Sequence, residues 1–92
     1  MRSTELTVQN RVGLHARPAA VFVKTACRFK CAVSVQNRTA GSPAVNAKSI
    51  LSVLTLGVEK GHSIVVTADG PDEVEALAAL QAALADRCGE AE

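Results

Sequence analysis

The sequence predicts an α+β domain in which helices cover one face of a single β-sheet. The 92-residue chain is 48% apolar, enough for one modest core, and we interpret residues 1–92 as a single domain. Segments with period-two alternation are interspersed with segments of helical spacing. The expected strands are half polar and the expected helices amphipathic, which favours one sheet with its helices on one side.

The chain is expected to begin with a strand and a helix. Over residues 4–9 apolar and polar positions alternate, with Leu6 and Val8 on one face. A loop follows, and the period becomes helical from Ala16 until about Arg28. The expected core positions of this helix are Ala19, Phe22, Val23 and Ala26.

A hairpin and a short helix are expected next. Residues 31–36 alternate again, the turn formers of 37–43 follow, and 44–47 is a short third strand. Ser49 is a suitable N-cap and Gly57 a suitable C-terminal stop, so a helix of about two turns lies between them.

The last strand and helix are the clearest elements. Residues 63–68 alternate, Pro71 suits the first helical position, and acidic residues follow it where a helix start is positive. Gly89 is expected to end this helix, before a frayed tail. Its predicted buried stripe is Val74, Leu77, Leu80 and Leu84. The order is therefore β-α-β-β-α-β-α.

Composition excludes several classes of function. The net charge is +1 and there are two Phe but no Tyr or Trp, which argues against nucleic-acid binding. No apolar run is long enough to span a bilayer, and the first ten residues do not resemble a signal peptide, so we expect a cytoplasmic protein. Cys27, Cys31 and Cys88 lack metal-like spacing, so we expect reduced thiols used as small apolar filler, with no metal and no cofactor.

One histidine lies in a setting suited to phosphoryl transfer. His15 stands in the stretch RVGLHARPAA, where a helix is expected to begin. A neutral imidazole is nucleophilic, and a helix start offers free N–H groups and partial positive charge to phosphoryl oxygens. Arg17 adds a planar cation, while Gly13, Ala16 and Pro18 shape the supporting backbone and loop. An isolated histidine at a helix start would more often be a solvent-exposed cap. The neighbouring residues favour a phosphoryl acceptor instead.

The segment GLHARPAAVFVKTA resembles the active-site segment of the HPr family, the histidine-containing phosphocarriers of the bacterial phosphoenolpyruvate:sugar phosphotransferase system. VNAKSILSVLTLGVEKG resembles the family's second motif, around a regulatory serine, and HSIVVTADGPDEVEALAALQAAL follows its closing strand and helix. The resemblance covers essentially the whole chain. It implies an open-faced β-sandwich, with an antiparallel four-stranded sheet of order 1-4-2-3 and three helices on one face.

The resemblance also implies a role. Phospho-enzyme I would pass its phosphoryl group to Nδ1 of His15, and His15 would donate it to the enzyme IIA domains of sugar permeases. Such a protein is a monomeric carrier, a substrate of other proteins and not an autonomous enzyme. Arg17 would assist phosphate handling. Ser49 would be the position where a serine kinase/phosphorylase acts in many members.

The short helix after Ser49 carries more apolar residues than one face can bury. We expect Val53 and Leu56 to face the core and Ile50, Leu51 and Leu54 to form an outward docking patch; the alternative is that all five are core. Other expected docking residues are Ala20, Lys24 and Lys48. His62 is interpreted as a solvated loop residue.

Some features depart from the family pattern. The turn within residues 37–46 is longer than usual, so this hairpin should project further. Ser52 and Cys27 stand where some members carry a basic residue, so affinity for the acidic surface of enzyme I should depend more on apolar contact. The alternatives are a regulatory HPr paralogue of a nitrogen-related branch, an HPr domain of a fusion protein, or an interaction module with an idle His15.

Overall fold

The computed structural model describes residues 1–9 and 12–85, which contain the elements expected from the sequence, in the same order. The strands are β1 (Arg2–Thr7), β2 (Ala32–Asn37), β3 (Val45–Asn46) and β4 (Ser63–Asp69). The helices are α1 (Ala16–Ala26), α2 (Ile50–Leu54) and α3 (Glu73–Ala85).

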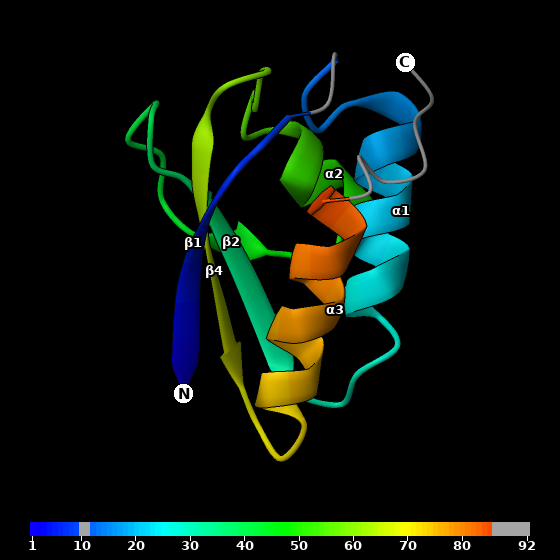
Figure 1. The fold of residues 1–92 in the computed structure, drawn as a ribbon. Helices are drawn as coiled ribbons and strands as arrows, with labels where there is room; N and C mark the ends of the chain where they lie inside the picture. Colours follow the sequence, from blue (N-terminus) through cyan, green and yellow to red (C-terminus); the bar gives the residue numbers. More distant parts are fainter. Residues whose placement is uncertain (10–11, 86–92) are drawn as a thin grey trace.

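The sheet has the order β1-β4-β2-β3, and every neighbouring pair is antiparallel. All three helices pack on one face of this sheet and leave the other face open (Figure 1). The predicted fold class and strand order are therefore confirmed. The connection between β2 and β3 projects as a loop from the edge of the sheet (Figure 1).

Strand alternation and helix faces together form the core. The inward-facing residues of β4 are buried, and the outward-facing ones are partly exposed, as period-two spacing requires. Phe22 of α1 and Leu80 of α3 are the largest helical side chains that are fully buried. Both belong to the one hydrophobic core between the helices and the sheet.

The predicted buried face of α3 is partly wrong. Val74 is 52% exposed, while Ala76, which the prediction omitted, is fully buried. Helix α3 packs against both α1 and β4, and a small alanine side chain lets these backbones approach closely. Leu80 and Leu84 are buried as predicted, and Leu77 packs against the core from a half-buried position.

Pro71 lies in the turn before α3 and not at its first helical position. The preceding turn is fixed by Asp72, whose carboxylate accepts the N–H groups of Lys30 at 2.8 Å and of Cys31 at 2.9 Å. The Lys30 N–H is the main reason that the pKa of Asp72 lies below its usual value. Burial raises the pKa of the Cys31 thiol, and its contact with Asp72 adds to this.

Other sequence predictions have mixed outcomes. The first strand occupies 2–7 and not 4–9, although Val8 beyond it is fully buried. Cys31 is buried filler as expected, but Cys27 is exposed, and both are free thiols.

Cys88, Gly89 and the predicted tail lie outside the described residues. Within 1–9 and 12–85, no helix is long and apolar enough to cross a membrane, and no side-chain cluster is suited to hold a metal ion.

Candidate functional site

His15 is the N-cap residue of α1, with an extended backbone (φ −124°, ψ 161°), and its side chain makes no capping hydrogen bond to the helix. The side chain is 37% exposed. The first-turn N–H groups of a helix lack intrahelical partners, and Pro18 has none to offer. The imidazole therefore stands at the positive end of α1, where the sequence predicted it, and is open to solvent.

The loop before His15 packs tightly against a second loop. The Leu14 N–H donates to the Val58 carbonyl at 3.0 Å. A Cβ added to Gly13, whose φ is +67°, would lie 2.0 Å from the same carbonyl oxygen. Only glycine fits this close approach, which explains the Gly13 of the motif. The contact brings residues 58–59 beside the histidine.

Ala16 has a positive φ of 51°. A left-handed conformation costs a residue with a Cβ about 1–2 kcal/mol, and such strain persists where the surroundings hold it in place. Ala16 is the first residue of α1 and directly follows His15, so this conformation lies where the chain passes from the histidine into the helix.

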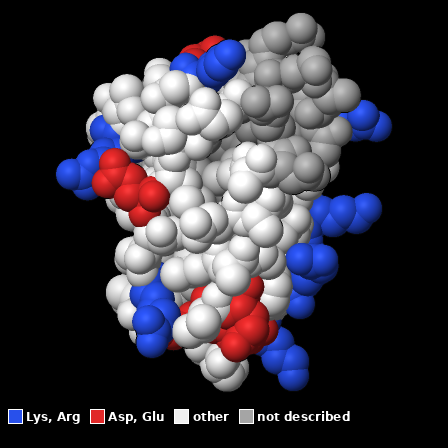
Figure 2. Space-filling view, in the orientation of Figure 1, with Lys and Arg blue, Asp and Glu red and all other residues white. Residues whose placement is uncertain are grey.

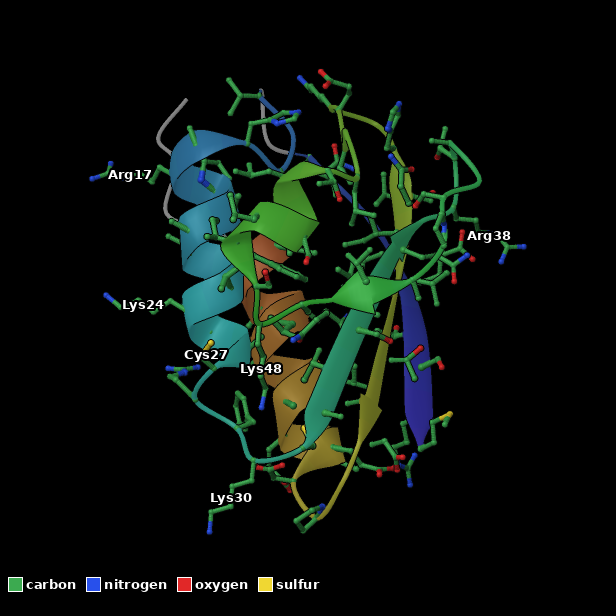
Figure 3. All side chains as sticks on the ribbon, turned by 180° about the vertical axis from the view of Figure 1, so that it is seen from behind. Arg17, Lys24, Cys27, Lys30, Arg38 and Lys48 are labelled. Carbon is green, nitrogen blue, oxygen red and sulfur yellow. The ribbon has the colours of Figure 1, made fainter. Side chains whose placement is uncertain are left out.

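Arg17 is exposed and points away from α1 into solvent (Figure 3). Within the described residues no hydrogen bond joins Arg17 to His15. His15 is the N-cap of α1 and Arg17 lies in its first turn, so the two side chains start from the same end of the helix.

The helix after Ser49 has the two faces predicted for it. Val53 is fully buried and Leu56 nearly so. The outward residues form what we term the apolar patch, with exposures of 38% for Ile50, 74% for Leu51 and 37% for Leu54. The alternative in which all five are core is therefore wrong. Because α1 and α2 are in contact, the apolar patch lies on the helix next to α1.

Cationic side chains line the outer side of α1. Lys24 and Ala20 are exposed there, and Lys24 points into solvent (Figure 3). Lys and Arg side chains follow the α1 side of the molecule, where no Asp or Glu is seen along the edge, whereas on the opposite side, at the top and at the lower end Lys and Arg lie close to Asp and Glu (Figure 2). Lys48 is half-buried, because its ammonium donates to the Phe29 carbonyl at 2.7 Å. The expected docking residues thus lie around α1 and α2.

Ser49 is the N-cap of α2, as predicted, and its hydroxyl accepts the N–H of Ser52 at 3.4 Å. It is half-buried beside the exposed Ile50. Ser49 is therefore partly accessible and next to the apolar patch.

The structure adds Glu59, which sequence reasoning did not identify. Its Oε2 lies 2.9 Å from Nε2 of His15, and the two residues are 44 positions apart in the chain. The prediction that His62 is a solvated loop residue is wrong. It is half-buried, and its Nδ1 accepts the Glu59 N–H and the Asn37 side-chain amide, both at 3.2 Å. The only signal in the sequence was that Glu59 is a charged residue directly before the turn at Lys60 and Gly61.

The fold and the site define a class: open-faced α+β sandwiches with an accessible histidine at the start of the first helix. The family model described as "PTS HPr component phosphorylation site" matches residues 2–86. A crystal structure of HPr from Thermoanaerobacter tengcongensis superposes with a TM-score of 0.93 and 39% identity, over 100% of both chains. HPr from Bacillus anthracis gives a TM-score of 0.84 and 37% identity, over 90% of this chain and 95% of that one.

The chain therefore belongs to the HPr family of phosphocarriers. Curated relatives include multiphosphoryl transfer proteins. That of Salmonella typhimurium is 40% identical over 96% of this chain and 23% of its own length, and that of Vibrio cholerae is 42% identical over 90% and 21%. The chain thus spans about a fifth of the length of these relatives.

Proposed function

We propose that this chain accepts a phosphoryl group from phospho-enzyme I on Nδ1 of His15 and donates it to enzyme IIA domains of sugar permeases. The observation that carries the proposal is the accessible imidazole at the positive end of α1, a helix with Lys and Arg along its outer side and α2, which bears the apolar patch, packed against it. The partner must bring its own phosphohistidine to the ring, and an exposed His15 permits this approach.

Arg17 supports the transfer in this proposal. Its guanidinium is free to turn toward a phosphoryl group on His15, where a planar cation forms charge-assisted hydrogen bonds to phosphate oxygens. The N–H groups of the first turn of α1 favour the same negative charge. These groups hold the phosphoryl oxygens without shielding the N–P bond from the next acceptor.

Docking is proposed to combine charge and apolar contact. Lys24 and the other cations along α1 complement an acidic partner and accelerate encounter. The apolar patch offers side chains that lose contact with water when the partner binds. Because all these groups belong to one chain, the form proposed to carry out transfer is a monomer. It is proposed to act in the cytoplasm, as a carrier and not as an enzyme. A serine kinase/phosphorylase acting on Ser49 is part of the same proposal.

A second candidate is an HPr domain within a larger phosphotransferase protein, or a regulatory paralogue. The multiphosphoryl transfer proteins named above favour the fusion, because this chain matches only a segment of each. The His15 chemistry would be the same, but the acceptor would be attached or would be a regulator.

Labelling with radioactive phosphoenolpyruvate and enzyme I tests the proposal. Wild-type protein should acquire an acid-labile, base-stable phosphate, and His15→Ala should fold normally and acquire none. Arg17→Ala should accept some label and donate it slowly. Undiminished labelling of His15→Ala would overturn the central claim. Sugar-specific and nitrogen-branch IIA domains, offered in parallel as acceptors, separate the two candidates.

A further inference from the structure

The Glu59 carboxylate determines which nitrogen of His15 carries a proton. A carboxylate only accepts hydrogen bonds, so the 2.9 Å contact requires a hydrogen on Nε2 of the imidazole. In a neutral ring the other nitrogen, Nδ1, then holds its lone pair. The nitrogen that the proposed function uses is therefore the one that keeps its lone pair free for bonding.

The backbone of Glu59 is held by hydrogen bonds on both sides. Its N–H donates to Nδ1 of His62, and its carbonyl accepts the His62 N–H at 3.0 Å. Because Nδ1 of His62 also accepts from Asn37, the neutral His62 ring carries its proton on Nε2. The turn 59–62 is thus tied in a fixed geometry.

Asn37 anchors this turn to the core. Its side chain is fully buried, and its amide donates to the Leu56 carbonyl at 3.0 Å as well as to His62. Its carbonyl oxygen accepts the Ala40 N–H at 3.1 Å. Every polar atom of the amide has a partner, which fixes its orientation. The Gly13 contact secures the other side of the turn.

We propose that Glu59 is a positioning residue for phosphoryl transfer: it orients the His15 ring and retains the Nε2 proton throughout the cycle. The proposal rests on the proposed function above. When Nδ1 attacks, its lone pair forms the new N–P bond while the N–P bond to the histidine of enzyme I breaks. The proton on Nε2 stays, so the ring gains a positive charge, which the Glu59 carboxylate neutralises.

Retention of that proton also serves donation. A phosphorylated ring that keeps Nε2–H leaves as a neutral imidazole when the acceptor takes the phosphoryl group. A ring that has lost the proton would have to leave as an imidazolate anion, which is a poorer leaving group. Glu59 thus keeps the N–P bond transferable at alkaline pH.

Several titratable or charged groups belong to the segments that meet at His15. Within the described residues, α1 carries Arg17 at its start, and the turn carries Glu59, Lys60 and His62. Only Glu59 among these is hydrogen-bonded to the ring. The Glu59 carboxylate is therefore the charged group that the described structure places in contact with Nε2.

Glu59→Ala is the decisive variant, because the side chain is 63% exposed and its removal leaves the fold intact. Glu75→Gln is the matched control. It also removes one exposed carboxylate, in the first turn of α3, and α3 begins at the end of the molecule opposite to the start of α1 (Figure 1). Donation from the phosphorylated proteins to a IIA domain is measured over a pH series. Nitrogen-15 NMR of the His15 ring reports the hydrogen bond at Nε2.

We expect donation by Glu59→Ala to fall about threefold to tenfold, the scale of an exposed charge-assisted hydrogen bond, and its alkaline decline to begin at lower pH. The Nε2–H signal of the unphosphorylated ring should move and exchange faster with water. Glu75→Gln should match the wild type. A Glu59→Ala profile that overlays the wild type would overturn the inference. Failure of the wild type itself to accept phosphate would instead refute the proposed function.

Discussion

Leu51 allows docking and stability to be separated by one substitution. Truncation to alanine removes three carbon atoms, worth roughly 2.4 kcal/mol at ~0.8 kcal/mol each if fully buried. Because Leu51 is 74% exposed, only about a quarter of that value is already gained in the folded monomer. Leu51→Ala should therefore cost about 0.6 kcal/mol of stability, or a Tm shift of about 2–5 °C.

The remaining three quarters of the Leu51 surface is available to a partner. If enzyme I covers it, the substitution should weaken binding by about 1.8 kcal/mol, which raises Kd about 20-fold. Val53→Ala is the matched control on the same helix. Val53 is fully buried, so its truncation should cost about 2 kcal/mol or more of stability and change Kd less.

Thermal unfolding and calorimetric titration with enzyme I measure both quantities. A salt series adds a further distinction. The deficit of Lys24→Ala should shrink as salt screens the charge, while the Leu51→Ala deficit should persist. An equal loss of Tm in Leu51→Ala and Val53→Ala, or wild-type affinity of Leu51→Ala for enzyme I, would contradict this division between stability and docking.

Three further predictions concern other parts of the molecule. Ser49→Asp should fold normally, because the start of a helix tolerates negative charge, but it should accept phosphate more slowly from the acidic enzyme I. Acceptance kinetics equal to those of the wild type at low salt would show that Ser49 serves only as the helix N-cap. Asn37→Ala should cost about 1–3 kcal/mol in urea unfolding, because it leaves buried partners such as the Leu56 carbonyl unpaired; an unchanged midpoint would contradict this. The pKa of Asp72 is lowered in the folded protein, so its stabilising effect is full above the unfolded-state pKa and is lost as pH falls through the folded-state pKa. Asp72→Asn should therefore reduce the loss of stability on acidification in a pH series. An unchanged dependence of stability on acidic pH would argue against it.

Periodicity predicted the elements well where one face of the segment is apolar and the other polar. It failed on α3 because Ala, Val and Leu occur around much of that helix, so spacing alone does not determine which residues face the core. Ala76 is buried and Val74 is exposed because α1 and β4 both pack against α3. The spacing of apolar residues in the sequence does not determine which side of the helix these neighbours cover.

The candidate site was predictable only in its local part. His15, Arg17 and Gly13 are close in sequence, and their residue types indicate the chemistry. Glu59 reaches His15 only because two loops, tens of residues apart, are hydrogen-bonded to each other. Asn37 belongs to a turn-forming run in the sequence, yet it is the polar residue that the fold buries completely beneath this turn.

The two nitrogens of His15 are therefore treated differently by the chain. The Nε2 side is met by Glu59, on a turn held by the buried Asn37 amide, so its geometry is fixed by the fold. On the Nδ1 side, the described residues provide no hydrogen bond to the ring, and Arg17 extends into solvent (Figure 3). A carrier needs this asymmetry. A site that enclosed the phosphoryl group on all sides would retain it, whereas a site fixed on one side and open on the other leaves the partner to complete the surroundings of the transferred group.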